Sequence, residues 1–244
     1  MMKEHFTIKR IPLGGVAAYL VHRPGKALLV DSGRSGSVNR IMETLAGEGL
    51  RPGMLKLLVL THAHFDHAGS ARKLKARTGC RIMVHHSEAD RLQKGFTGLP
   101  GGTRWKARIL VGLGRIFARR LGKYEGVEPD ILVEGSYDLL KEFEVPAQVI
   151  HAPGHTPGSL VVLTDSGELL AGDCFFGLKG KEYFPPFAEN IPALLESWKM
   201  IRSLPVETIY PAHGNPITAQ QFHDAYEHAL KKYGRRKKSP SSEI

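Results

Sequence analysis

Short apolar runs, each bounded by polar residues or glycine, recur along most of the chain and are typical of buried strands. The clearest of them is Leu57-Leu58-Val59-Leu60. On this pattern the expected strands cover residues 5–10, 16–22, 27–31, 57–61, 81–85, 147–151, 160–164, 168–172 and 207–210. The segments between and after them predict helices near residues 37–48, 67–78, 191–203 and 218–233.

Two groups of strands with accompanying helices predict an α/β (α+β) fold, in which two sheets pack face to face under outer helices. In such a four-layer αββα sandwich the strands are buried on both sides. A chain of 244 residues fits one large domain. We therefore expect a single domain over residues 1–234, followed by a basic, disordered tail at residues 235–244.

Polar residues of one chemical kind follow the run Leu57–Leu60. The segment Thr61–His67 reads THAHFDH and places three imidazoles and one carboxylate within six residues. Sites in α/β folds lie at the carboxyl ends of strands, and imidazole and carboxylate are ligands for divalent ions such as zinc. An apolar core has no use for four such groups, since each unpaired one costs free energy on burial. The segment therefore predicts a metal site.

Three later segments share one arrangement, an apolar strand that leads to a single ligand-type side chain. One strand runs into a Pro/Gly turn that presents His155, a second ends in Gly-Asp at Asp173, and a third delivers His213. Taken singly, each residue is more often an ordinary histidine or a turn-capping aspartate. Their repetition beside the histidine cluster favours one shared metal site.

The motif His-x-His-x-Asp-His, followed by a histidine, an aspartate and a further histidine, resembles the signature of the metallo-β-lactamase-fold hydrolases. The resemblance covers nearly the whole chain, from the turn at Val30–Gly33 to His213. It implies the αββα sandwich of that type and two metal ions. By the resemblance, one ion is bound by His62, His64 and His155, the second by Asp66, His67 and His213, and both by a bridging Asp173.

Asp31, at the end of the run Ala27–Val30, matches a position that in this family braces the histidine loop from outside the ligand set. Ligating histidines usually donate their other ring N–H to a carboxylate or a carbonyl, which agrees with such a role. From the residues alone, an ordinary turn aspartate is an equal alternative.

Composition indicates a soluble protein, because no stretch approaches the roughly 18 apolar residues that span a bilayer. The N-terminus lacks the apolar core of a signal peptide. With only Cys80 and Cys174, a disulfide framework is not expected and a cytoplasmic location is. Cys174 follows Asp173 directly, and in a strand its side chain points away from the metals, which favours a structural role over a catalytic one.

Residues 94–128 interrupt the pattern of strands and helices. Glycines lead into the segment Thr103–Gly122, where apolar side chains including Trp105 and Ile109 share one side of a helix and arginines lie opposite. In the family resembled, this stretch often forms a lid over the metals. We expect a helical lid insertion whose Trp105 and Ile109 contact the substrate. A helix packed on the domain, or one that docks on an anionic membrane, is the alternative.

The formal charge of +10 comes from 34 Lys plus Arg against 24 Asp plus Glu, and part of it lies in the C-terminal tail. Such an excess can steer an anionic substrate or nucleic acid, or serve only solubility, which is the commoner case. An apolar lid and the lack of a recognisable tRNA-grasping arm argue against nucleic acid as the partner. A homodimer through the lid is conceivable, although no feature demands it.

The resemblance implies a dinuclear metal-dependent hydrolase. We expect two zinc ions, with iron or manganese as alternatives because the same ligands suit all three. Two ions roughly 3.5–4 Å apart can hold a bridging hydroxide, since metal coordination lowers the pKa of water to near 7. This hydroxide is expected to attack an ester-like carbonyl while Asp66 orients it or accepts its proton.

The expected substrate is a small acyl thioester or ester, because a bridging aspartate resembles that of glyoxalase-II-type thioesterases. Lactonases and tRNA-processing nucleases share this feature. A lactonase of the acyl-homoserine-lactone type is therefore the first alternative, followed by promiscuous β-lactamase and phosphodiesterase activity. Phe176 stands where quorum-quenching lactonases carry a tyrosine, and Tyr183 could replace that tyrosine from the following loop. Lys179 could bind a substrate carboxylate or be an ordinary exposed lysine.

Overall fold

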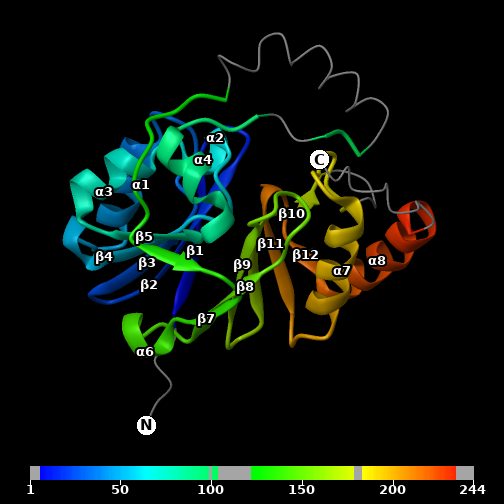
Figure 1. The fold of residues 1–244 in the computed structure, drawn as a ribbon. Helices are drawn as coiled ribbons and strands as arrows, with labels where there is room; N and C mark the ends of the chain where they lie inside the picture. Colours follow the sequence, from blue (N-terminus) through cyan, green and yellow to red (C-terminus); the bar gives the residue numbers. More distant parts are fainter. Residues whose placement is uncertain (1–5, 99–100, 104–121, 179–182, 235–244) are drawn as a thin grey trace.

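The computed structural model describes residues 6–98, 101–103, 122–178 and 183–234. Its strands form two six-stranded mixed sheets (Figure 1). The first sheet contains, in spatial order, β1 (Thr7–Pro12), β2 (Ala17–Arg23), β3 (Lys26–Val30), β4 (Leu55–Val59), β5 (Arg81–His85) and β6 (Ile131–Val133). The second contains, in spatial order, β12 (Ile217–Thr218), β11 (Thr208–Gly214), β10 (Glu168–Gly177), β9 (Leu160–Thr164), β8 (Ala147–His151) and β7 (Ser136–Asp138).

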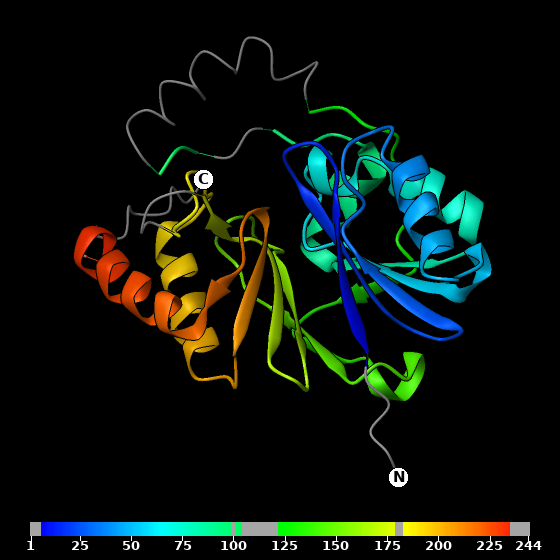
Figure 2. The ribbon, with the colours of Figure 1, turned by 180° about the vertical axis from the view of Figure 1, so that it is seen from behind.

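Helices lie outside both sheets (Figure 1, Figure 2). On the side of the first sheet are α1 (Val38–Gly47), α3 (Ala71–Thr78) and α4 (Ala89–Lys94), and on the side of the second are α7 (Ile191–Arg202) and α8 (Ala219–Tyr233). The short helices α2 (Phe65–Ala68) and α6 (Leu140–Phe143) and the 3-10 turns η1 (Pro52–Met54) and η2 (His86–Glu88) lie in connections. The predicted four-layer αββα sandwich is thereby confirmed.

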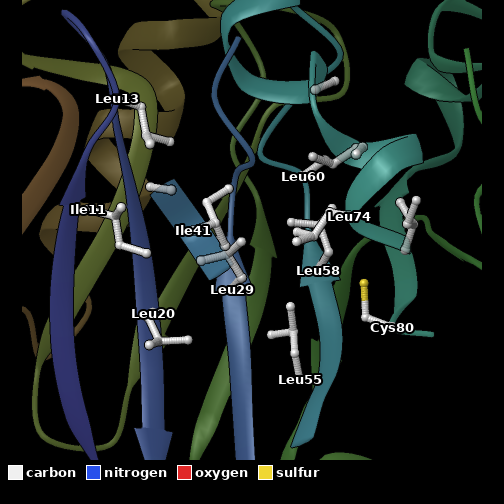
Figure 3. Close-up of a cluster of buried hydrophobic side chains, with 14 of the residues drawn as sticks. Ile11, Leu13, Leu20, Leu29, Ile41, Leu55, Leu58, Leu60, Leu74 and Cys80 are labelled. Atoms are coloured by element: carbon white, nitrogen blue, oxygen red, sulfur yellow. The ribbon is translucent and has the colours of Figure 1, made fainter. Parts of the chain in front are cut away.

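Apolar side chains form three layers of core, because strands such as β3, β9 and β10 are buried on both faces. Between the sheets, Leu57 of β4 and Val162 of β9 belong to one cluster. Outside the first sheet, Leu58 of β4 packs in a second cluster with Ile41 of α1 (Figure 3). Outside the second sheet, Trp198 of α7 belongs to a third. Adjacent residues of β4 thus face different layers, which explains why its sequence is an unbroken apolar run.

The helix predicted at residues 67–78 is wrong in one respect, since two helices, α2 and α3, cover this region. A Cβ on Gly69, between them, would lie 2.5 Å from the backbone nitrogen of Ser35. The hydroxyl of Ser70 donates to the carbonyl of Arg34 at 2.6 Å. The junction between α2 and α3 therefore packs closely against the loop before α1, and only glycine fits at position 69.

Two strands extend further than the pattern predicts, and both changes affect the candidate site. β10 continues to Gly177 and β11 to Gly214, and the two pair in parallel. Asp173 and His213 therefore lie within paired strands and do not follow them. The elements β6, β7, β12, α4 and α6 have two to six residues each, too few to show a period in the sequence.

Most of the expected lid, residues 104–121 with Trp105 and Ile109, lies outside the described residues, as does the tail at 235–244. The flanks of the lid segment are described, and isolated β-bridges join Phe96 to Lys123 and Gly102 to Phe187. The helical lid stays a prediction. Among the described helices, none has the length and apolar character needed to cross a membrane.

Candidate metal centre

Side chains from four separate segments converge at one edge of the sandwich. The loop after β4 and the helix α2 carry the THAHFDH motif, the turn after β8 carries His155, β10 carries Asp173 and β11 carries His213. Asp66 and His213 are half-buried, and the other five candidate ligands are buried. The structure thus brings together every residue of the expected ligand set.

Three histidines, His62, His64 and His155, form what we name the first cluster. Nδ1 of His64 lies 2.9 Å from Nε2 of His62 and 3.1 Å from Nε2 of His155. Because Nδ1 of His155 donates to the carbonyl of Phe187 at 3.0 Å, its Nε2 carries the free lone pair. Burial, reinforced by the neighbouring imidazoles, lowers the pKa of both His62 and His64. Three buried ring nitrogens that converge on one point fit a divalent cation.

The second cluster consists of Asp66, His67 and His213. The carboxylate of Asp66 lies 3.6 Å from Nε2 of His213 and 3.9 Å from Nε2 of His67. Nδ1 of His213 donates to the carbonyl of Gly15 at 2.7 Å, and Nδ1 of His67 donates to Asp31 at 2.8 Å. In both rings Nε2 is the nitrogen left to face the cluster. One carboxylate and two imidazoles suit a second divalent ion.

Asp173 lies between the two clusters. Its Oδ2 is 3.5 Å from Nε2 of His155, and its Oδ1 is 3.3 Å from Nε2 of His67 and 3.4 Å from Nε2 of His213. Burial acts to raise the pKa of Asp173, but the facing imidazoles hold it well below its ordinary value. An ionised carboxylate with one oxygen toward each cluster fits a ligand shared by two ions.

Two buried atoms at the centre indicate that a cation belongs there. Oδ1 of Asp173 and Nε2 of His67 have no hydrogen-bond partner within the described part of the chain, and buried polar atoms are rarely left so. Burial disfavours the charged form of His67, but Asp173 and Asp31 raise its pKa well above the ordinary value. A divalent ion would take the place of that proton and satisfy both atoms.

Gly172 explains how a strand presents Asp173 to the clusters. Its φ is +50°, and a Cβ there would lie 2.5 Å from the hydroxyl of Thr61. The pairing of β10 with β11 shifts register on both sides of Gly172, as in a β-bulge that re-aims a side chain. Cys174 packs in the cluster around Trp198, and burial followed by the charge of Asp173 raises its pKa. A buried, protonated thiol fits the structural role expected for it.

Asp31 contacts one histidine of each cluster, directly or through Thr61. Its carboxylate accepts the Nδ1–H of His67 at 2.8 Å, the backbone N–H of Thr61 at 2.8 Å and the Thr61 hydroxyl at 2.9 Å. The Thr61 hydroxyl lies 3.0 Å from Nδ1 of His62. Asp31 is buried and has a φ of 63°, which is uncommon outside glycine. These contacts support the bracing interpretation over that of a turn residue.

Two contributors to the site are not singled out by the sequence. The hydroxyl of Thr61 links Asp31 to His62, and its place as the first residue of the THAHFDH motif is the only signal that could have pointed to it. The carbonyl of Gly15, 198 residues before His213, orients that histidine. A backbone carbonyl carries no sequence signal, so only the packing of the β1–β2 turn reveals it.

The residues expected to bind substrate are placed only in part. Phe176 is buried and its ring stacks on that of His213, with centroids 4.8 Å apart and an interplanar angle of 17°. The Phe176 N–H donates to the carbonyl of Tyr183, a half-buried residue that packs against the cluster around Trp198. Lys179, Trp105 and Ile109 lie outside the described residues. The substrate-binding role of all five stays a prediction.

The chain is similar in sequence to known proteins. Residues 11–213 match the Metallo-beta-lactamase superfamily. The "Probable metallo-hydrolase YflN" of Bacillus subtilis is 26% identical over 220 residues, which cover 83% of this chain and 81% of that protein. The "Hydroxyacylglutathione hydrolase" of Methylococcus capsulatus is 28% identical over 199 residues, which cover 80% of this chain and 60% of that protein.

Solved structures agree with the fold. The BLEG-1 B3 metallo-beta-lactamase superimposes with a TM-score of 0.69 at 24% identity, over 91% of this chain and 99% of that chain. A metallo-beta-lactamase of Cronobacter sakazakii superimposes with a TM-score of 0.69 at 17% identity, over 94% of this chain and 90% of that chain. At such identities the likeness concerns the fold alone.

Proposed function

The chain belongs to the metallo-β-lactamase superfamily and is a metal-dependent hydrolase, and on this premise we propose its substrate class and the roles of its residues. The substrates are thioesters or related esters of small acyl compounds. The centre holds two divalent ions, with zinc as the first candidate and iron or manganese as the alternatives.

One observation supports a dinuclear centre above all others, namely the position of Asp173. Its two oxygens face different clusters, at 3.5 Å from His155 on one side and 3.3 Å from His67 on the other. Each cluster offers three further nitrogen or oxygen ligands that lie within 4.8 Å of one another. A single ion would leave one of these converging sets without a cation.

The chain's own residues divide the work according to their exposure. Two bound divalent ions would polarise the substrate carbonyl and lower the pKa of a water molecule to near 7. His62, His64 and His155 are buried, burial lowers the pKa of His62 and His64, and all three serve only as ligands. Asp66, with a side chain 15% exposed, faces the second cluster from the open side. There it orients the attacking water and accepts its proton.

The thioester assignment draws on one relative and the lactone alternative on one contact. The similarity to a hydroxyacylglutathione hydrolase over 80% of this chain supports an acyl-glutathione-like thioester. An acyl lactone is the second candidate, because Phe176 stacks on His213 and forms an apolar wall beside the second cluster. An acyl chain can lie against such a wall.

Metal analysis and kcat/KM, measured on one metal-replete preparation, test the proposal. We expect two metal equivalents per chain and a kcat/KM of about 10⁴ M⁻¹s⁻¹ or more for an acyl-glutathione thioester, with a lower value for an acyl-homoserine lactone. Faster hydrolysis of the lactone than of the thioester would make lactones the first candidate substrate and thioesters the second. Values orders of magnitude lower for both would reject carbonyl substrates in favour of phosphodiesters. One equivalent of metal would reject the dinuclear centre.

A further inference from the structure

Glu88 is a fully buried carboxylate that does not belong to the ligand set. It is the last residue of η2, directly before α4, and its side chain is 0% exposed. A buried carboxylate is unfavourable unless hydrogen bonds and charge partners compensate for the lost hydration. The groups that surround Glu88 therefore indicate its role.

Both oxygens of Glu88 accept backbone N–H groups from ligand-bearing loops. Oε2 accepts the N–H of Ala63 at 3.2 Å, and Oε1 accepts the N–H of Gly158 at 3.1 Å. Ala63 lies between His62 and His64, and Gly158 lies in the turn that presents His155. One side chain thus connects the two segments that supply the first cluster.

The Ala63 peptide is held from its other side as well. Its carbonyl accepts hydrogen bonds from the hydroxyl of Thr97 at 2.9 Å and from that of Tyr124 at 2.8 Å. Side chains therefore satisfy the N–H and the carbonyl of Ala63, a task that backbone partners perform in a helix or a strand. The backbone between the two histidines depends on these contacts for its conformation.

The Gly158 side is equally close-packed. A Cβ on Gly158 would lie 2.5 Å from Cγ of Glu88, so only glycine permits this approach. Arg91 lies 3.6 Å from Oε1 of Glu88 and makes a bidentate pair with Glu189 at 2.7 and 3.1 Å. The N–H of Glu189 donates to the carbonyl of His155. The network that begins at Glu88 thus reaches the His155 turn at two points.

We propose that Glu88 is a positioning residue that fixes the spacing between the His62–His64 loop and the His155 turn, and so sets the affinity of the first cluster for its ion. The inference rests on the ligand assignment in the proposed function. His64 and His155 are 91 residues apart in sequence, yet their ring nitrogens must stay close enough to bind the same ion. A carboxylate accepts both amides at once, whereas a carboxamide offers only one acceptor oxygen.

The variant Glu88→Gln tests the proposal with two readouts that need no substrate. Zinc affinity is measured by competition with a chromogenic chelator, and exchange of the Ala63 and Gly158 amides is followed by NMR in metal-free and zinc-loaded protein. We expect the first cluster to bind zinc about 10–100-fold more weakly. At least one of the two amides should exchange faster than in the wild type.

Asp130→Asn is the matched control, because Asp130 also accepts a backbone N–H, that of Ile82 at 2.8 Å, and pairs with Lys75. This variant should lose stability while zinc affinity and the exchange of both amides stay at wild-type values. The proposal is overturned if Glu88→Gln keeps wild-type zinc affinity and amide exchange, or if Asp130→Asn weakens zinc binding as much.

Two further samples keep these outcomes separable. If Glu88→Gln does not fold, Glu88→Asp provides the same comparison, because the shorter side chain keeps its charge and cannot reach both amides. Wild-type affinity and exchange in Glu88→Asp would count against the proposal in the same way. A wild-type protein that binds no zinc, iron or manganese would reject the proposed function, whereas the amide exchange would still decide whether Glu88 holds the two loops.

Discussion

The two clusters of the candidate centre differ in burial and in how they are held. The first cluster is wholly buried, and a carboxylate, Glu88, orders the loops that carry it. The second cluster is open at Asp66 and His213, whose side chains are 15% and 16% exposed. Its histidines are oriented by Asp31 and by the carbonyl of Gly15.

This difference assigns different tasks to similar ligands. A buried site of three imidazoles would exclude water and hold an ion in a fixed position. A site with a partly exposed carboxylate can admit a substrate and move a proton. We therefore expect the first cluster to control metal retention and the second to control turnover, with Asp173 common to both.

The largest effect is expected at Asp173, because a substitution there should weaken metal binding at both clusters alike. Asp173→Asn takes the shared negative charge away from both, so the binding of both ions should weaken. Activity should fall by at least about 100-fold, beyond the usual cost of losing an outer-sphere partner. Metal content by elemental analysis and kcat/KM measure the two effects. Full retention of both ions would disprove the sharing of Asp173.

Asp66→Ala should separate the clusters from each other. This change removes a ligand of the second cluster and the proton acceptor, so kcat should fall by about 10²–10⁴-fold. Among the described residues, the ion pairs of Asp66 are with His67 and His213 of the second cluster, so the ion of the first cluster should remain bound. Metal titration together with kcat tests this. Wild-type kcat in the variant would sink the assignment of Asp66.

Asp31→Asn and Thr61→Val form a matched pair of variants, because the first should weaken metal binding at both clusters and the second mainly at the first cluster. Asp31 contacts His67 directly and His62 through the Thr61 hydroxyl, so Asp31→Asn should weaken both ions, by about 10–100-fold. Thr61→Val removes the link to His62 and a hydroxyl hydrogen bond to Asp31, but it leaves the contact between Asp31 and His67, so it should weaken the first ion more than the second. Chelator competition on both variants measures the effect. Equal loss of both ions in Thr61→Val would contradict the assignment.

The smallest expected effect concerns the stability contributed by His85 of β5, whose ring stacks on that of His151. Burial, helped by the stacked His151, lowers the pKa of His85 to about 4. Because the unfolded chain binds this proton at a higher pH, stability contributed by neutral His85 is complete above pH 6.5 and is lost as the pH falls towards 4. The slope is at most about 1.4 kcal/mol per pH unit.

Urea denaturation of metal-free wild type and His85→Gln between pH 4 and 7 checks this linkage. The variant should show a flatter loss of stability over that interval, while its second cluster keeps wild-type metal affinity. Parallel pH profiles for the two proteins would mean that His85 does not carry the linked proton.

The sequence alone indicated which residues could form the centre and which segments form the longer strands, although not β6, β7 and β12. Imidazoles and carboxylates grouped behind the apolar run Leu57–Leu60 predict a metal site because their burial is unfavourable without a cation. The apolar runs are too continuous for sheets with one face in solvent, so both faces of each sheet must be covered, which predicts four layers. These properties are local, and each can be recognised within about ten residues.

Tertiary structure decided everything that depends on contact between distant segments. The sequence does not show that the register of β10 shifts at Gly172 and that Asp173 lies between the two clusters. Glycine is needed at position 172 because Thr61 lies so close to it, and only the folded chain shows this contact. Nor does the sequence show that Gly15 orients His213 across 198 residues, or that Glu88 joins the loops of Ala63 and Gly158. Side-chain chemistry shows which residues can bind a metal ion. The spacing between these residues depends on hydrogen bonds of backbone groups, whose partners come within reach only in the folded chain.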